Sequence, residues 1–228
     1  MRIALIDSGI GGLTLLKRLL DRCPANDYVY FADTYAHPYG RERANSLKVR
    51  IARIAELLYE NGAEMLIFAC NTASTVALDF VKKELPIPVF GVKPTYVKEE
   101  KTLIMCTPLT AKSELVKGYE REGAKVYANL CLASLIEENR FNVKALDDYL
   151  NNELQIYKGM DKIVLGCTHY VFVREGIEKA TGAKTCDCYD KIIEEVESLS
   201  AKAGKGRLRF MFTGPRKDEE YNEILSKI

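Results

Sequence analysis

The sequence has only two histidines, His37 and His169, and no two cysteines in a C-x-x-C arrangement. Closely spaced zinc ligands and dithiol redox centres are therefore lacking, and we expect no metal. No apolar run approaches the length that spans a bilayer, so we expect no membrane association. The apolar run Ile3–Ile6 is too short for a signal peptide, and no small-residue cleavage site follows it. The expected location is the cytoplasm.

An excess of charge of one sign is also lacking, because 33 Lys and Arg balance 32 Asp and Glu. A formal net charge of +1 gives no electrostatic basis for binding nucleic acid or an anionic membrane. The seven cysteines are expected to be mostly reduced in the cytoplasm. Among them, the pair in Cys186-Asp187-Cys188 is interpreted as structural or incidental, because cysteine is one of the most commonly buried residues.

What the sequence does contain is a regular alternation of apolar strands with helical segments. A chain of 228 residues has room for one large or two modest hydrophobic cores. The alternation predicts the α/β class, with parallel sheets flanked by helices. In the first part we expect strands at Ile3–Ile6, Tyr28–Ala32 and the run that begins at Met65, and a connection or strand at Pro86–Gly91. The expected helices are Leu13–Leu20, Glu42–Gly62 and one from Val76 onward.

A crossing at Val92–Thr95 is predicted to lead into a second lobe. Its expected strands are Thr102–Cys106, Lys125–Ala128 and Lys162–Leu165, and its expected helices are Lys112–Glu122, Val143–Tyr157 and Lys191–Ala203. A strand at Leu208–Phe212 and a helix at Asp218–Lys227 are expected to return to the first lobe. The predicted division is therefore residues 1–92 plus 207–228 for the first α/β lobe, and 93–206 for the second.

A glycine-rich turn, Ser8-Gly9-Ile10-Gly11-Gly12, follows the first strand and Asp7. Glycines at such a turn let the backbone approach a ligand, and the following helix N-terminus favours an anion. The turn is not a dinucleotide fingerprint, because Thr14 stands where the third glycine should be, and it lacks the Gly-Lys-Ser/Thr of a phosphate-binding loop. Ligands of parallel sheets bind beyond the carboxyl ends of the strands, where Asp7, Asp33 and Cys70 fall.

Two cysteines, 97 positions apart, each end an apolar run and precede polar residues, in Ala69-Cys70-Asn71-Thr72 and Gly166-Cys167-Thr168-His169. A single cysteine of this kind is usually a buried structural residue. Here both cysteines are followed by residues that can donate hydrogen bonds to a carboxylate. A core whose polar groups are all paired would not need such donors at two separate places. The pattern predicts two half-sites that face one cavity.

Two thiols on opposite sides of a substrate suit one task, which is to remove a proton from one face and return one to the other. Enantiomers have equal free energies, so both directions need comparable bases. A cysteine with an unperturbed pKa of about 8.5 is only slightly ionised at pH 7. A helix N-terminus directly after each cysteine is expected to lower its pKa and increase the thiolate fraction.

Four segments resemble the signature blocks of the glutamate racemase family, in the family's order and across both halves of the chain. They are Asp7–Leu13, Ala32–Thr34 with Pro38–Gly40, Ala69–Ala73 and Gly166–Tyr170. The resemblance implies two pseudo-symmetric α/β lobes with the active site in the cleft between them. It also implies a two-base enzyme without a cofactor that interconverts L- and D-glutamate for peptidoglycan synthesis, with a homodimer as one expected assembly.

By the same resemblance, Cys70 serves D-glutamate and Cys167 serves L-glutamate, with Asp7 and His169 assisting the two thiols. The matching substrate-binding positions are Asp7, Ser8, Tyr39, Gly40, Asn71, Thr72, Thr168 and His169. Asp33 and Glu137 match further acidic positions near the site, and Thr107–Thr110 matches a threonine loop of the second lobe. The chain is shorter than the family pattern around Ala128–Asn142.

Two alternatives stay open. One is an aspartate or broad-specificity racemase of the same superfamily, against which His169 after Cys167-Thr168 favours glutamate. The other is a two-lobe protein that closes on an acidic amino acid without chemistry, against which the paired thiols favour catalysis. A thiol redox role is less favoured because there is no C-x-x-C pair.

Overall fold

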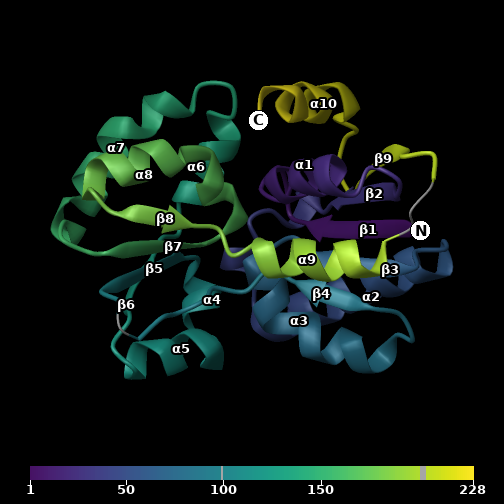
Figure 1. Ribbon diagram of the computed structural model, residues 1–228, viewed down its shortest axis with the longest axis horizontal. Coiled ribbons are helices and arrows are strands. Elements are labelled where there is room, and N and C mark those ends of the chain that lie inside the picture. The colour runs from purple at the N-terminus through teal and green to yellow at the C-terminus, as the bar shows by residue number, and fades with distance from the viewer. Residues whose placement is uncertain (99, 201–203) are drawn as a thin grey trace.

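The structure is a computed structural model that describes residues 1–98, 100–200 and 204–228. Two sheets lie side by side, each flanked by helices (Figure 1). One has five strands in the order β4-β3-β1-β2-β9, and the other has four in the order β6-β5-β7-β8. Neighbouring strands in both sheets are paired in parallel. The predicted fold class, two α/β lobes built on parallel sheets, is confirmed.

The interior strands are nearly continuous apolar runs, because helices cover both faces of each sheet. In β1 every residue after Arg2 is buried, and all of β3 and β5 is buried. The last strand, β9, pairs with β2, so the chain returns to the first sheet as expected. The strands are β1 Arg2–Asp7, β2 Asp27–Ala32, β3 Met65–Phe68, β4 Val89–Gly91, β5 Thr102–Cys106, β6 Lys125–Ala128, β7 Lys162–Gly166, β8 Lys184–Cys186 and β9 Leu208–Phe212.

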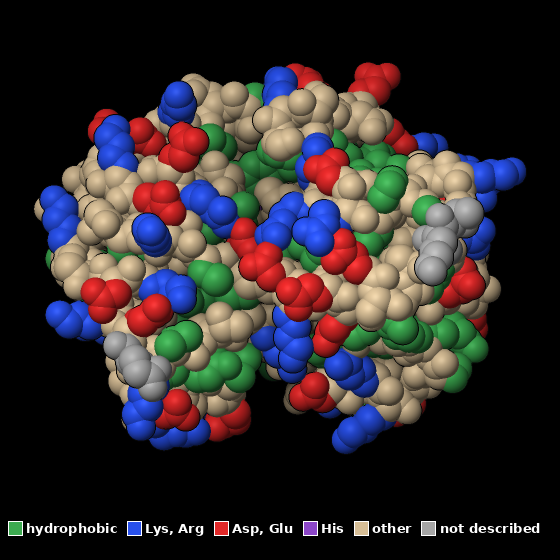
Figure 2. All heavy atoms as spheres, viewed as in Figure 1, with side chains coloured by type: hydrophobic (Ala, Val, Ile, Leu, Met, Phe, Trp, Pro, Cys, Tyr) green, Lys and Arg blue, Asp and Glu red, His purple; other side chains and the backbone are tan. Residues whose placement is uncertain are grey.

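The α-helices are α1 Leu13–Arg22, α2 Ala44–Glu60, α3 Asn71–Glu84, α4 Pro108–Ala111, α5 Glu114–Arg121, α6 Leu132–Glu138, α7 Asp147–Leu154, α8 Arg174–Thr181, α9 Asp190–Leu199 and α10 Asp218–Lys227. None of these described helices is long and apolar enough to cross a membrane. Figure 2 shows acidic and basic side chains interspersed over the face in view, as the balanced composition predicts.

Helix α3 begins at Asn71, five residues before the predicted start at Val76. The polar residues after Cys70 were expected to form a turn, but they form the first turns of the helix. Ser74 donates from its hydroxyl to the carbonyl of Cys70 at 2.9 Å, and Thr75 donates to the carbonyl of Thr72 at 3.1 Å. Their side chains therefore bond within the helix, where such residues otherwise favour turns.

The second lobe contains more elements than the sequence predicted. The helix expected at Lys112–Glu122 is the slightly shorter α5, and Ser113 caps the N-terminus of α5 by accepting from the amide of Val116. The helix expected at Val143–Tyr157 is α-helical only over α7, with a short 3-10 helix at each end. Four short elements, α4, α6, α8 and β8, were not predicted.

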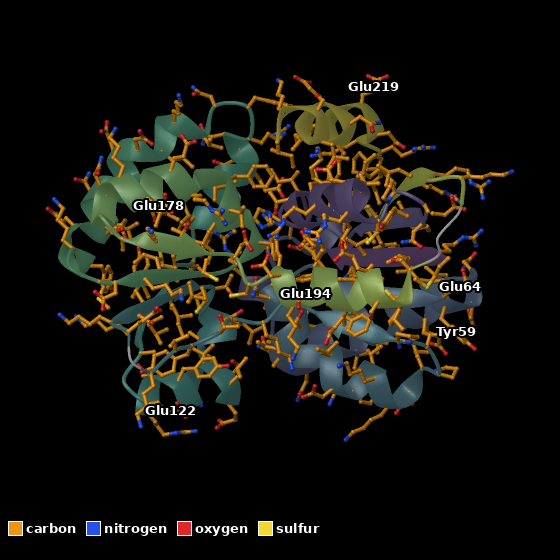
Figure 3. The ribbon with its side chains drawn as sticks, in the orientation of Figure 1. Tyr59, Glu64, Glu122, Glu178, Glu194 and Glu219 are labelled. Atoms are coloured by element: carbon orange, nitrogen blue, oxygen red, sulfur yellow. The ribbon has the colours of Figure 1, made fainter. Side chains whose placement is uncertain are left out.

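Helix α9 covers most of the helix expected at Lys191–Ala203, whose last three residues lie outside the described part of the chain. It packs against α1, and Figure 3 labels Glu194 on it, in front of the first sheet. Arg18 and Arg22 of α1 pair with Asp190 at 2.5 Å and Glu197 at 2.7 Å. We propose that α9 belongs with the first lobe, and the other predicted lobe limits stay predictions.

Candidate active site

Cys70 and Cys167 stand at corresponding places in the two sheets, just beyond the ends of the interior strands β3 and β7. Cys70 precedes α3, and Cys167 precedes a 3-10 helix over Thr168–Val173. Carboxyl ends of parallel strands are where α/β proteins place their ligands. The two residues are only 6% and 5% exposed, so both thiols are enclosed in this structure.

The surroundings of Cys70 disfavour its thiolate. Burial is the main reason that the pKa of this thiol lies well above its usual range, and the charges of Asp7 and Cys167 raise it further. Backbone N–H groups of Ala73 and Thr72, in the first turn of α3, act in the opposite direction. The expectation of a lowered pKa at Cys70 is therefore wrong, because the desolvation of a buried thiolate outweighs the donors at the helix N-terminus.

Asp7 is fully buried at the end of β1 and connects the two lobes. One carboxylate oxygen accepts from the backbone N–H of Gly9 at 2.8 Å, and the other accepts from the hydroxyl of Thr168 at 3.3 Å. Burial raises the pKa of Asp7 to about 6, although the positive charge of His169 opposes this shift. Asp7 is thus a carboxyl group that can exchange a proton close to neutral pH.

The raised pKa of Asp7 predicts a pH-dependent cost in stability. In the folded protein the pKa of Asp7, about 6, exceeds the ordinary value of 3.8. The preference of the fold for the protonated carboxyl therefore stabilises the protein fully below pH 3.8, and this stabilisation is lost as the pH rises through 6. A shift of this size corresponds to about 3 kcal/mol. We expect Asp7→Asn to be more stable than the wild type by up to that amount at pH 8, and by much less at pH 4.5. Urea unfolding at both pH values checks this, and a gap that does not widen with pH contradicts it.

His169 is buried beside Cys167, with 3.9 Å between its Nδ1 atom and the sulfur. Its Nε2 atom lies 2.9 Å from Oε1 of Glu137 on α6. Burial alone lowers the pKa of His169, but its contacts with Cys167 and Glu137 raise it well above the usual range. Although burial also opposes ionisation of Glu137, its hydrogen bond with His169 contributes to a pKa of about 2. The geometry favours a protonated imidazole between a carboxylate and a sulfur.

Asn71 directly follows Cys70 and has a side chain without partners in the described structure. Its amide nitrogen and amide oxygen are both buried and neither has a hydrogen-bond partner. Buried polar groups are nearly always paired, because an unpaired one costs about 1–3 kcal/mol. One amide can donate to a carboxylate and accept from an ammonium group, so Asn71 is suited to hold an amino acid.

Three threonine hydroxyls meet between the lobes. Thr72 Oγ1 lies 2.9 Å from Thr107 Oγ1 and 3.0 Å from Thr110 Oγ1. Thr107 also caps α4, accepting from the backbone N–H of Thr110. The structure thus joins Thr72 of the first lobe to the predicted threonine loop of the second.

Two glycines allow the lobes to approach closely at this place. A Cβ atom on Gly40 would lie 2.6 Å from the Cβ of Thr107, and one on Gly11 would lie 2.4 Å from Nδ1 of His169. Real Cβ atoms do not show contacts this short, so larger residues at these positions would push the opposite lobe away. The glycine-rich turn therefore serves close approach to the second lobe.

Asp33 lies at the end of β2, but its carboxylate is already occupied. It accepts from the guanidinium of Arg50 at 2.5 Å, from the hydroxyl of Tyr39 at 2.8 Å and from the hydroxyl of Thr213 at 2.7 Å. Despite burial, these bonds lower the pKa of Asp33. Asp33 therefore stabilises the loop that carries Tyr39 and Gly40, and Tyr39 is a buried part of the same network.

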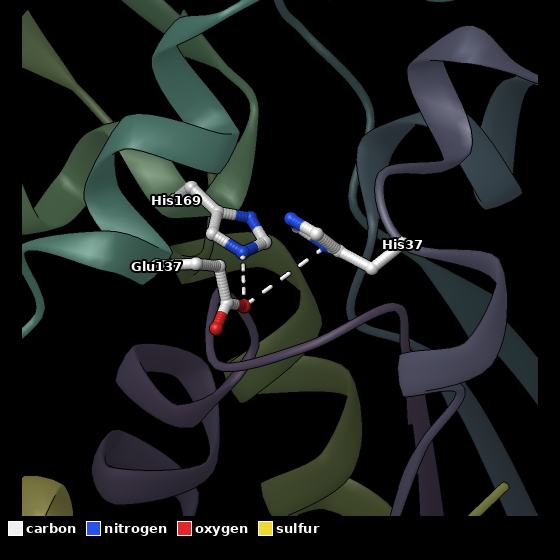
Figure 4. A group of neighbouring side chains, drawn as sticks. All are labelled: His37, Glu137 and His169. Carbon is white, nitrogen blue, oxygen red and sulfur yellow. Dashed lines mark hydrogen bonds and ion pairs between the residues drawn. The ribbon is translucent and has the colours of Figure 1, made fainter. Parts of the chain in front are cut away.

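His37 lies at the site as well, although no sequence motif predicted a role for it. Its Nδ1 atom lies 3.3 Å from the hydroxyl of Ser8. The same atom lies 4.0 Å from Oε1 of Glu137 (Figure 4). Its ring centroid is 5.1 Å from that of His169. The only signal in the sequence was that the chain has two histidines in all, since the three side chains come from segments far apart.

A cavity of about 860 Å³ lies apart from the two cysteines, between the outer side of α1 and the end of α10. Its lining includes Thr14, Arg140, Phe172, Cys186 and Ile224. Its charged residues are already paired, as in the contacts of Arg18 and Arg174 with Asp187. The convergent polar groups of the candidate site are thus not in this cavity.

Comparison with known proteins agrees with this arrangement. A family model described as Asp/Glu/Hydantoin racemase matches residues 25–196. The glutamate racemase of Fusobacterium nucleatum is 33% identical over 93% of this chain and 89% of its own length. The glutamate racemase of Halothermothrix orenii is 33% identical over the full length of both chains.

A solved structure shows the same fold. The glutamate racemase of Francisella tularensis, in complex with D-glutamate, matches all of this chain and 94% of its own with a TM-score of 0.83 and 28% identity. The family match and the full-length relatives are sufficient to place the protein. The chain belongs to the Asp/Glu/hydantoin racemase family and, within it, to the glutamate racemases.

Proposed function

We propose that the protein interconverts L-glutamate and D-glutamate with two cysteine bases and without a cofactor. The observation that carries the proposal is the placement of Cys70 and Cys167 at equivalent strand ends, enclosed together with Asp7 and His169. The relatives matched over the whole chain are glutamate racemases, which supports glutamate as the substrate.

The two half-sites differ in the groups that surround their thiols. The contacts of His169 favour its protonated form, which stabilises negative charge on the nearby sulfur of Cys167. The buried thiol of Cys70 stays protonated. The resting enzyme is therefore prepared to accept the α-proton on Cys167 and to donate a proton from Cys70.

With L-glutamate bound, the Cys167 thiolate removes the α-proton and becomes a thiol, while the electron pair of the C–H bond stays on the substrate. The Cys70 thiol then donates its proton to the opposite face of the α-carbon and becomes a thiolate. Asp7, whose pKa of about 6 is near neutrality, can assist the transfer of protons to and from Cys70. The reverse direction uses the same steps in the opposite order.

Substrate binding is assigned to the polar residues around the thiols. The unpaired amide of Asn71 is suited to the α-carboxylate and α-ammonium groups, since it can donate to one and accept from the other. Thr72, Thr168, Ser8, Tyr39 and Gly40 complete the proposed set. Because the thiols are enclosed, substrate reaches them only when the lobes separate.

The cellular role follows from the same proposal. The enzyme acts in the cytoplasm and supplies D-glutamate for peptidoglycan synthesis, and a homodimer is its expected assembly. Light scattering after size-exclusion chromatography measures the assembly directly.

Incubation of purified protein with single amino acids, followed by chiral chromatography, tests the reaction. L-Glutamate is expected to yield D-glutamate, and aspartate and neutral amino acids are expected to react far more slowly. Equal rates with aspartate would favour a broad-specificity racemase. Binding of glutamate without inversion or α-hydrogen exchange would favour a binding protein.

Activity is expected to survive removal of metals and of pyridoxal phosphate. The two thiols, Asp7 and His169 supply the proton transfers themselves. The measurement is the racemisation rate after exhaustive dialysis against EDTA and after treatment with a carbonyl reagent. A lost activity that returns with a divalent metal or with pyridoxal phosphate would contradict the mechanism.

A further inference from the structure

Both histidines of the chain lie beside the half-buried carboxylate of Glu137 (Figure 4). His37 comes from the loop after β2, Glu137 from α6, and His169 from the 3-10 helix after β7. One ligand atom of each residue lies within 4.8 Å of the others. Two imidazoles and a carboxylate are a common ligand set for zinc and similar transition metals.

The spacing is close to what one ion requires. Zinc lies about 2.0–2.1 Å from a histidine nitrogen and about 2.0–2.2 Å from a carboxylate oxygen, so a tetrahedral ion holds two of its ligand atoms about 3.3–3.5 Å apart. Oε1 of Glu137 is already 2.9 Å from Nε2 of His169 and 4.0 Å from Nδ1 of His37. To bind one ion, the 4.0 Å separation must shorten by about 0.6 Å and the widest separation, which is within 4.8 Å, by up to about 1.4 Å. A small shift of the loop that carries His37 supplies these changes.

The surroundings of the three side chains leave room for a ligand and orient the groups that would bind it. Nε2 of His37 is buried and has no hydrogen-bond partner in the described structure, so this side chain has an unused ring nitrogen. Glu137 Oε1 accepts from the backbone N–H of Ile10 at 2.7 Å, and Cys167 lies on the other nitrogen of His169. Such outer contacts orient metal ligands.

We propose that His37, Glu137 and His169 form an inhibitory site for a divalent transition metal of the zinc class. The ion takes the place of the hydrogen between Glu137 and His169 and leaves one coordination position open for water or a substrate carboxylate. His37 belongs to the first lobe and the other two ligands to the second, so the ion ties the lobes together. The ion also binds the imidazole of His169, which then can no longer assist Cys167. The inhibition rests on the proposed function, whereas the binding does not.

Cobalt(II), added to the metal-free protein, is the probe for binding, because its visible spectrum reports the ligand atoms. We expect one ion per chain by titration calorimetry, with visible d–d absorption and without a thiolate charge-transfer band in the near ultraviolet. His37→Gln should weaken this binding by at least about tenfold, since even loss of an outer-shell partner of a metal ligand costs 10–100-fold. Cys186→Ser, in the C-x-C segment, is the matched control and should bind as the wild type does.

Inhibition is measured as the glutamate racemisation rate with increasing Zn²⁺, relative to the metal-free rate of each variant. His37→Gln should require at least about tenfold more Zn²⁺ for half inhibition than the wild type. A thiolate band with Co²⁺, or equal Co²⁺ affinity of the wild type and His37→Gln, overturns the site. Binding as expected without any inhibition overturns the inhibitory role. A protein that binds Co²⁺ as expected but does not racemise glutamate refutes the proposed function and leaves the metal site standing.

Discussion

Replacement of either Cys70 or Cys167 by serine is expected to reduce racemisation by roughly 10²–10⁴-fold in both directions, the usual contribution of a positioned acid or base. A serine hydroxyl has a far higher pKa than a thiol, so it neither removes nor returns the α-proton efficiently. Inversion needs both residues, because one removes the proton on one face and the other donates on the opposite face. Loss of one therefore stops both directions.

The surviving thiol should still act on its own face. By the assignment proposed here, Cys167→Ser keeps α-hydrogen exchange with D-glutamate, and Cys70→Ser keeps it with L-glutamate. Proton NMR in deuterium oxide follows exchange and inversion separately. Cys131→Ser, at an exposed cysteine, is the control and should behave as the wild type does. A folded Cys70→Ser or Cys167→Ser variant that racemises at the wild-type rate rules out the two-base mechanism.

The second large effect is expected at the two assisting residues, Asp7 and His169. His169→Asn removes the imidazole beside Cys167, and should slow the direction from L-glutamate more. Asp7→Asn removes the carboxylate that influences Cys70, and should slow the direction from D-glutamate more. We expect losses of roughly 10–100-fold in the more affected direction, as for residues that orient a reactive group.

This asymmetry must be sought in kcat and in exchange rates. Enantiomers have equal free energies, so kcat/KM is the same in both directions for every variant, and only kcat and KM can change unequally. Asp79→Asn, at an exposed carboxylate that pairs with Lys93, is the matched control for Asp7→Asn. Wild-type kcat values from both enantiomers in both variants would remove Asp7 and His169 from the mechanism.

Much of the framework was predictable from local patterns. Strands of parallel sheets are apolar runs, and the buried β5 and the more exposed edge strand β6 have the boundaries that were predicted, Thr102–Cys106 and Lys125–Ala128. The places of Cys70 and Cys167 were also predictable, because residues that follow the strands of an α/β sheet lie at its carboxyl edge. Short elements were missed, since β8 has three residues and α6 only seven.

The electrostatics of the site could not be predicted, because they depend on contacts across the chain. A helix start after Cys70 is visible in the sequence, but the burial that raises its pKa is not. Likewise, Glu137 meets Ile10 across 127 positions, and only the fold brings His37 and His169 together. Asp33 was expected near the substrate, but its carboxylate already accepts hydrogen bonds from Arg50, Tyr39 and Thr213.

The most direct test of the two-thiol mechanism is the incubation of the wild-type protein with L-glutamate in deuterium oxide. If Cys167 removes the α-proton and Cys70 donates a solvent-derived hydrogen from the opposite face, every molecule of D-glutamate formed carries deuterium at the α-carbon. Early in the reaction, the remaining L-glutamate should contain much less deuterium than the product. D-Glutamate that retains the original α-hydrogen, or the absence of D-glutamate, would contradict the mechanism.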